Sequence, residues 1–397
     1  MTRHTMLAAA TLACGAAAGA QETLLPRAGW GVGTALSAWH FSTAIPQASG
    51  AVANVVEAAV PFRVLGNIGR WSVDLSGAGA VGAVHFAAGE EGDGDDRAVT
   101  IAGPTDVKLR FTGPLLSDAL QLTAGLNLPV GKVGLNAEET SALQVLGAPA
   151  LRMPVAAFGT GAGMTLGIIR AFEGEDWAIA VGASAEQRTE YSPIALALSS
   201  GRSETKIAPG AALHITAGLD RALGEGRWAL LLVGDVFSKD KVRLPESTDG
   251  SSDYTLGPQF TLSSQIDLAA PGWRAAAFGV AARLRSEFTD AAGAKVAGSS
   301  GTYLEGSLGG VRGGPSGSGF ILGADARWHS GLTFTDALVG AAVTAAGLTI
   351  GVERAGTATL TRFTVHGQYG SFDTGTLATT GFGVTLGLSV SARREVR

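Results

Sequence analysis

Near its end the chain reads GFGVTLGLSVS, residues 381–391. Every second side chain from Phe382 to Val390 is large and apolar, and those between them are glycine, serine or threonine. Successive side chains of a β-strand point to opposite faces. This stretch is therefore predicted to be a strand with one apolar face and one small, polar face.

The same alternation returns along the chain, for example over residues 54–65 and 120–130. In the first of these stretches, Val56 and Val60 oppose Glu57 and Arg63. The predicted strands are roughly 10–15 residues long, whereas the mean strand has about 5–6 residues. A tilted strand that crosses a bilayer needs about 9–11 residues. Because helical periodicity is scarce, the sequence predicts an all-β fold, an antiparallel transmembrane β-barrel.

Short and long connections alternate between these strands. The short ones are 66–70, 113–118, 173–176, 223–227, 270–272, 313–317 and 354–356; the longer ones are 42–50, 87–103, 131–158, 191–208, 242–252 and 289–300. Two more connections, 331–336 and 370–376, are shorter, but the alternation places them on the same side as the long connections. Short turns on one side and long external loops on the other are typical of outer-membrane barrels. Counting gives about sixteen strands in one barrel over residues 21–397, with twelve or fourteen left open because the number should be even.

The composition fits such a wall. Glycine accounts for 58 of 397 residues, charged residues for only 16%, and apolar residues for 46%. In hydrocarbon every backbone polar group must be paired, so a sheet must close on itself, with an apolar outside and a polar inside. The net charge of −5 argues against a nucleic-acid partner. The single cysteine, Cys14, excludes a disulfide framework, and no cofactor is expected.

The seven tryptophans stand at strand ends. Five of them open strands on the short-turn side: Trp30, Trp71, Trp177, Trp228 and Trp273. Trp39 and Trp328 lie near the opposite ends of their strands. We interpret them as two rings of membrane-interface aromatics. The alternative is that they cap the strands of a soluble protein.

The charges within strands are predicted to face the lumen, because an arginine or lysine on the lipid face costs about 2–4 kcal/mol at the midplane. The candidates are Glu57, Arg63, Lys108, Arg110, Glu186, Arg188, Glu190, Arg283, Arg285, Glu287, Asp325 and Arg327. They could select solutes by polarising and narrowing the path. They could equally form ion pairs that only brace the wall.

The first twenty residues resemble an export signal. A short basic start is followed by an apolar run over residues 6–13 and by small residues up to Ala20. This pattern predicts a secretory signal peptide that is cleaved before Gln21. A lipoprotein signal cleaved before Cys14 is the alternative. The predicted location is the outer membrane of a Gram-negative bacterium.

Two features could carry other chemistry. Glu91, Asp93 and Asp95 have the spacing of the first ligands of a calcium loop, but the later glycine and glutamate are missing, so a solvated external loop is favoured over a metal site. His329 and His366 could serve a barrel hydrolase. The Gly-x-Ser-x-Gly motif of many hydrolases is absent, so the chain is not expected to be an enzyme.

Two further stretches carry a family resemblance: DVKLRF at 106–111, and LTAGLNLPVGK at 122–132, where a strand ends in Leu-Pro-x-Gly before a long loop. They resemble outer-membrane transporter-like barrels associated with aromatic-hydrocarbon (phenol meta-pathway) degradation, which are distantly similar to long-chain fatty-acid transporters. The resemblance implies a monomeric barrel that passes small, often hydrophobic molecules. The sequence departs from the fatty-acid transporters in having no long segment before Trp30 to form their hatch.

The predicted function is a channel or transporter through which small solutes, hydrophobic or aromatic ones among them, pass passively along the barrel lumen. One alternative is a general diffusion porin. Another is a structural or adhesion barrel that binds partners with its external loops. The expected partners are outer-membrane lipid and lipopolysaccharide, the solute and the barrel-assembly machinery.

Overall fold

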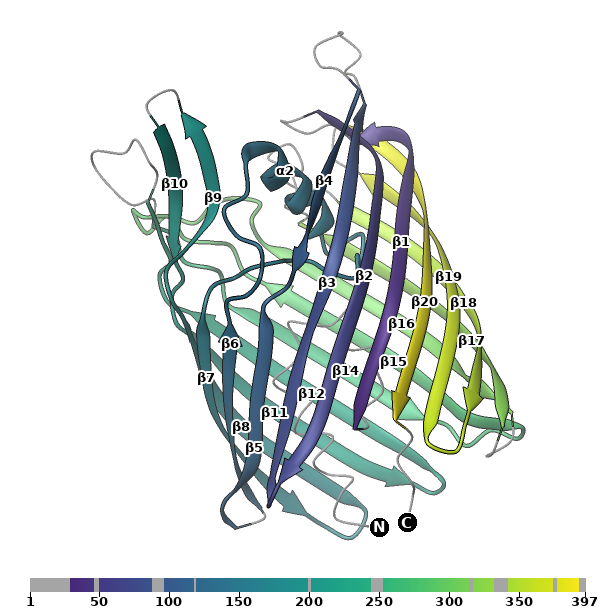
Figure 1. Ribbon diagram of the computed structural model, residues 1–397. Coiled ribbons are helices and arrows are strands. Elements are labelled where there is room, and N and C mark those ends of the chain that lie inside the picture. The colour runs from purple at the N-terminus through teal and green to yellow at the C-terminus, as the bar shows by residue number, and fades with distance from the viewer. Residues whose placement is uncertain are drawn as a thin grey trace.

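A computed structural model describes residues 29–45, 50–87, 96–117, 119–198, 201–243, 253–313, 317–331, 342–373 and 377–392 (Figure 1). The predicted signal peptide and the residues Glu91, Asp93 and Asp95 lie outside these ranges.

The described chain forms a closed antiparallel barrel. Its wall strands are β1 (Trp30–Ile45), β2 (Ala51–Ile68), β3 (Trp71–Ala87), β4 (Arg97–Pro104), β5 (Val107–Ser117), β6 (Leu120–Leu128), β7 (Gly163–Glu173), β8 (Trp177–Arg188), β11 (Ala212–Leu223), β12 (Gly226–Phe237), β14 (Gln259–Asp267), β15 (Trp273–Arg285), β16 (Gly301–Arg312), β17 (Ser318–Ser330), β18 (Ala342–Ala355), β19 (Thr359–Asp373) and β20 (Ala378–Ala392). Strand β1 pairs with β2 on one side and with β20 on the other, which closes the sheet on itself.

The wall has sixteen strand positions. The sheet contains seventeen strands, but β4 and β5 lie end to end along β3, with β5 on its first half and β4 on its second. The prediction of a sixteen-stranded antiparallel barrel is confirmed. The interruption between β4 and β5 falls at Thr105 and Asp106.

The connections alternate in length as the sequence predicted. Tight turns such as Gly69–Arg70, where Gly69 has φ +61°, join strands at the end where β1 begins and β20 ends (Figure 1). The longer connections lie at the other end. Beyond the barrel there, β9 (Tyr191–Leu198), β10 (Gly201–Ala208) and β13 (Lys241–Arg243) form a small antiparallel sheet. The predicted loop 87–103 is shorter than expected, because β4 occupies its second half.

The two faces of the wall differ as the alternation requires. In β1, Val32 and Leu36 are 41% and 44% exposed, whereas Ala35 and Trp39 are 2% exposed. The exposed apolar side chains belong to the outer face, and the buried ones point into the barrel. In the described ranges no helix is long and apolar enough to cross a membrane.

The connection between β6 and β7, residues 129–162, is named the inner segment here. The sequence predicted an external loop over 131–158, and that prediction is wrong. The inner segment carries α2 (Ala137–Leu146) and packs against apolar side chains that β1–β4, β18 and β19 turn inward. Leu146, Leu151 and Phe158 are 1% exposed in this core. The physical reason is that this half of the inner wall is apolar, with side chains such as Val55 and Phe86 that need a covering.

Candidate functional site

The inner segment is anchored at the interruption of the wall between β4 and β5. The carboxylate of Asp106 accepts hydrogen bonds from the backbone N–H of Gly131 at 2.9 Å and of Thr160 at 2.7 Å. It also accepts from the Thr160 hydroxyl and from Asn127 Nδ2, both at 2.9 Å. The Asp106 N–H donates to the carbonyl of Phe158 at 2.9 Å. One buried carboxylate therefore fixes both ends of the inner segment to the wall.

The close approach of backbone and side-chain atoms at this anchor explains why residue 131 is a glycine. A Cβ on Gly131 would lie 2.3 Å from the Phe158 carbonyl oxygen and 2.7 Å from Asp106 Oδ1. Asp106, Asn127 and Gly131 all fall within the two stretches that carried the family resemblance. The sequence placed Asp106 beside Lys108 and Arg110 in one strand and did not predict the anchor.

Helix α2 is fixed over β4 by polar contacts at its start. Asn136 caps the helix and forms a capping box with Glu139. Lys132 Nζ lies 2.6 Å from Glu139 Oε1, and Arg97 Nη1 lies 3.2 Å from Glu138 Oε1. Burial opposes the charged form of Glu139, but the hydrogen bonds from Lys132 and from the Asn136 N–H leave its pKa below the usual value.

The far part of the inner segment is bound by side chains that point inward from three strands. Trp39 Nε1 donates to the Leu151 carbonyl at 2.9 Å. Glu57 Oε1 accepts from the Val155 N–H at 2.6 Å, and Arg327 Nη2 donates to the Ala150 carbonyl at 3.0 Å. The segment is thus attached to β1, β2 and β17 as well as to Asp106.

Arg152 extends this attachment to the wall at β16 and β17. Its guanidinium forms an ion pair with Glu305 and donates to the Tyr303 hydroxyl at 2.5 Å, and it lies 3.8 Å from Asp325. Its backbone φ is +52°, in the left-handed region that side chains rarely adopt. A non-glycine residue in that region indicates that its surroundings hold it there.

Among the described residues, two arginines beside this contact have no carboxylate partner. Arg283 lies over the Tyr303 ring at 5.6 Å, and Arg285 lies over the Phe288 ring at 4.9 Å. In the part of the chain that the structure describes, neither forms a salt bridge. With Arg152 and Arg327, four guanidiniums face the two carboxylates of Glu305 and Asp325. The local charge of this part of the lumen is positive.

The rest of the inner wall is polar and stays accessible. On β8 and β11 the side chains of Arg188, Glu186 and His214 are 40%, 32% and 25% exposed. Arg188 pairs with Glu186 at 2.7 Å, and His214 Nδ1 lies 2.7 Å from Asp235 Oδ1 on β12. The inner segment covers one side of the barrel interior and leaves this side open to solvent.

Most lumen candidates lie where the alternation placed them. Glu57, Arg63, Lys108, Arg110, Glu186, Arg188, Arg283, Arg285, Asp325 and Arg327 all lie on the inner faces of their strands, Arg63 bonded to Asp74 at 2.9 Å. Glu190 and Glu287 do not, because β8 ends at Arg188 and β15 ends at Arg285. Glu190 instead lies 3.4 Å from Arg243 of the small sheet.

Six of the seven tryptophans lie on the outer face, and the interface role predicted for Trp39 is wrong. Trp30, Trp177 and Trp328 are 44%, 43% and 38% exposed, whereas Trp39 is 2% exposed inside the barrel. The alternation of side chains along β1 could have predicted the inward position of Trp39. Trp30 and Trp39 are an odd number of positions apart in one uninterrupted strand, so they point to opposite faces.

The two histidines that were candidates for a barrel hydrolase lie in wall strands. His366 Nδ1 lies 2.9 Å from Thr349 Oγ1, and its Nε2 lies 3.7 Å from Asp325 Oδ1, which links β17, β18 and β19. His329 is buried with its ring 5.8 Å from that of Tyr303. Among the described residues no three His, Cys, Asp or Glu side chains gather as metal ligands would.

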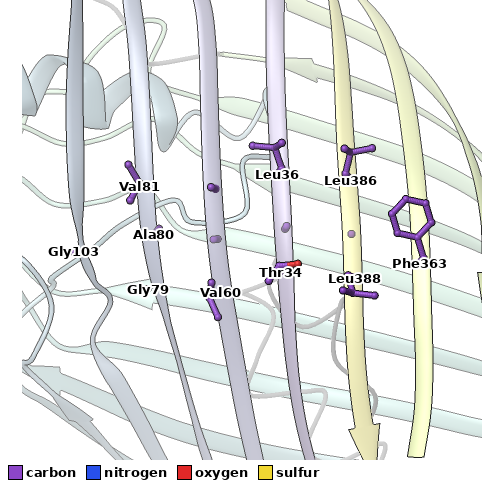
Figure 2. A pocket seen from close by; sticks show the side chains of 14 residues that line it. Thr34, Leu36, Val60, Gly79, Ala80, Val81, Gly103, Phe363, Leu386 and Leu388 are labelled. Carbon is purple, nitrogen blue, oxygen red and sulfur yellow. The ribbon is translucent and has the colours of Figure 1, made fainter. Parts of the chain in front are cut away.

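The outer face carries one shallow apolar depression. Figure 2 shows Gly79 and Thr34 between the larger side chains of Leu36, Val60, Val81, Phe363, Leu386 and Leu388, with Gly103 at one edge of the depression. The depression crosses β1–β4, β19 and β20 on the side of the wall that faces away from the lumen. Its lining is that of a lipid-facing surface.

No protein-family model and no curated protein matches the sequence. Among solved structures, the chain is similar to OprB of Pseudomonas putida, at 9% identity and a TM-score of 0.46 over 91% of this chain and 94% of that one. It is similar to OccK2 (OpdF) of Pseudomonas aeruginosa, solved with glucuronate, at 9% identity and a TM-score of 0.43 over 94% and 98%. A bacterial polysaccharide outer membrane secretin matches at 9% identity and a TM-score of 0.42 over 92% and 99%.

Proposed function

We propose that this chain is a passive channel in the outer membrane of a Gram-negative bacterium. In this proposal the chain is exported by a signal peptide that is cleaved before Gln21. Small solutes pass along the barrel lumen between the inner segment and the polar wall. The observation that carries the proposal is the inner segment itself. A barrel of sixteen strands is wide enough to enclose an aqueous channel, and a bound segment inside it sets how large a solute can pass.

The charged lining supports a preference for anionic solutes. Among the described residues Arg283 and Arg285 have no carboxylate partner, and together with Arg152 and Arg327 they outnumber the two carboxylates of Glu305 and Asp325. A positive region with low-dielectric walls raises the local concentration of anions. Guanidinium groups also bind carboxylates with two parallel hydrogen bonds.

The aromatic preference implied by the family resemblance is a finer part of the proposal. Tyr303 lies inside the lumen beside Arg152 and Arg283 and could stack with a ring. The buried cluster of Trp39, Phe41 and Phe372 cannot do so, because the inner segment covers it. We therefore expect charge to matter more than aromaticity.

The test compares solutes of matched size in liposomes that contain the purified protein. Benzoate, benzyl alcohol and a short aliphatic carboxylate separate the effect of charge from that of the ring. We expect both carboxylates to enter faster than the alcohol, and the double variant R283Q/R285Q to reduce that preference several-fold. Equal uptake of all three would favour the general diffusion porin. No uptake and no conductance in planar bilayers would contradict a channel and favour a structural barrel.

The matched control is Arg63→Gln. Arg63 also lies on the inner face, but its charge is paired with Asp74, so it contributes less to the field that a solute meets. Its loss should leave the ratio of benzoate to benzyl alcohol uptake nearly unchanged. A shift as large as that of R283Q/R285Q would show that overall lumen charge, rather than the site beside Arg152, sets the preference.

A further inference from the structure

The charges on the outer face of the barrel are distributed unequally between its two ends. In the described wall strands, the arginines and lysines on the outer face are Arg170, Arg221, Arg312 and Arg354, all of them exposed. Each stands at, or within three residues of, the end of its strand, on the short-turn side. The one outward carboxylate in those strands, Asp373, ends β19 at the opposite end.

Their orientation follows from their neighbours two positions away on the same face. Ile168 is 42% exposed, Leu223 45% and Val352 47%, and each of them alternates with inward side chains. These four arginines, named the arginine rim, therefore extend from an apolar surface at one level of the barrel.

The outward tryptophans stand at the same level. Arg221 is paired in register with Trp177 of β8 and with Trp228 of β12, and Arg312 is paired with Trp273 of β15. The Arg170 guanidinium lies 5.0 Å from the centre of the Phe172 ring. Directly opposed side chains of neighbouring strands are in contact distance. The aromatic rings thus mark the depth at which the guanidiniums lie.

The depth of the guanidiniums determines which lipid groups they can meet. Tryptophans of membrane proteins sit at the level of the lipid headgroups, and arginines near the end of a spanning element extend toward the same level. A guanidinium there meets phosphodiester groups and can donate two parallel hydrogen bonds to one of them. Carboxylates occur nearby at Glu173, which ends β7, and in the turns below Arg170 and Arg221 at Glu175, Asp176 and Glu225, while the described turn residues below Arg312 and Arg354 carry none.

We propose that the arginine rim binds the phosphate groups of anionic glycerophospholipids in the leaflet on the short-turn side. The positive charge of the rim and the negative charge of those headgroups are complementary, and the described wall strands carry no outward arginine or lysine at the other end. The proposal rests on the barrel lying in the membrane and not on any solute path, so its failure is distinguishable from failure of the channel.

The test measures bound lipid on the purified full-length protein by native mass spectrometry. Wild type and R170Q/R221Q/R312Q/R354Q are each incubated with phosphatidylglycerol and with phosphatidylcholine. We expect wild type to retain several phosphatidylglycerol molecules and the variant to retain at least threefold fewer, with little difference for phosphatidylcholine. Equal retention of phosphatidylglycerol by both proteins would overturn the proposal.

Two controls make the outcome specific. The variant R283Q removes a charge that faces the lumen, so it should keep the wild-type lipid count. Unchanged conductance of the quadruple variant in planar bilayers would show that the barrel is folded. If lipid A displaces phosphatidylglycerol at equal concentration from wild type but not from the quadruple variant, the rim binds lipopolysaccharide instead and the proposal is wrong.

Discussion

The two halves of the inner wall share the same alternating strand pattern, but one half turns apolar side chains inward and the other half turns polar side chains inward. On β1–β4 the inward positions carry Trp39, Val55 and Phe86, and the inner segment covers them. On β8, β11 and β12 the inward positions carry the polar side chains of Glu186, His214 and Asp235, of which Glu186 and His214 remain 32% and 25% exposed. A barrel in a membrane needs an apolar outside, but its inside is free to be either dry or wet. The boundary between the two halves therefore decides the size and lining of the path.

The largest expected effect comes from removing the anchor of the covered half. Asp106→Ala deletes four hydrogen bonds and leaves the N–H groups of Gly131 and Thr160 without that acceptor. Hydrogen bonds to a charged group contribute about 1.5–3 kcal/mol each, and three of the four hold the inner segment, so we expect it to lose roughly 5–9 kcal/mol of attachment. Single-channel conductance should rise several-fold, and protease should cut within 129–162.

The matched control lies in the open half. Asp235 is as buried as Asp106, at 8% against 7%, and accepts hydrogen bonds from His214 and Gln259. Asp235→Ala should change conductance little, because it does not contact the inner segment. If both variants raise conductance equally, Asp106 does not limit conductance by holding the inner segment, and the distinction between the covered and the open half is wrong.

A smaller effect is expected from the apolar contact itself. Leu146 of α2 is 1% exposed and packs inside the barrel, whereas Leu308 is 55% exposed on the outer face. Leu146→Ala should weaken the attachment of α2 by about 2–4 kcal/mol through lost burial and the cavity that is left. Hydrogen exchange of the amides of 137–146 should accelerate accordingly, while Leu308→Ala should leave it unchanged. Unchanged exchange in Leu146→Ala would mean that the polar anchors alone hold the segment.

Sequence patterns predicted the wall but not what fills it. Alternation, turn length and parity follow from local geometry, so the sixteen strands and the inward position of Arg283 could be predicted. The anchor could not, because Asp106 meets Thr160 across 54 positions of sequence. The inner segment looked like an external loop because its apolar residues follow no period of two. Position along the strand alone indicated an interface role for Trp39, whereas its parity in β1 places it on the inner face.

The smallest expected effect concerns the residue that links the covered half to the charged site. Arg152→Ala and Arg152→Gly both remove the contacts to Glu305 and Tyr303, so they share that loss. They differ at the backbone, where φ is +52°. A left-handed conformation costs a residue with a Cβ about 1 kcal/mol, and glycine adopts it freely. The glycine variant should therefore bind the inner segment about 1 kcal/mol more tightly than the alanine variant, as measured by the free energy of opening in hydrogen exchange. Equal protection in both variants would mean that the backbone at this position relaxes once the guanidinium is gone, and that the ion pair with Glu305 is what imposes the conformation.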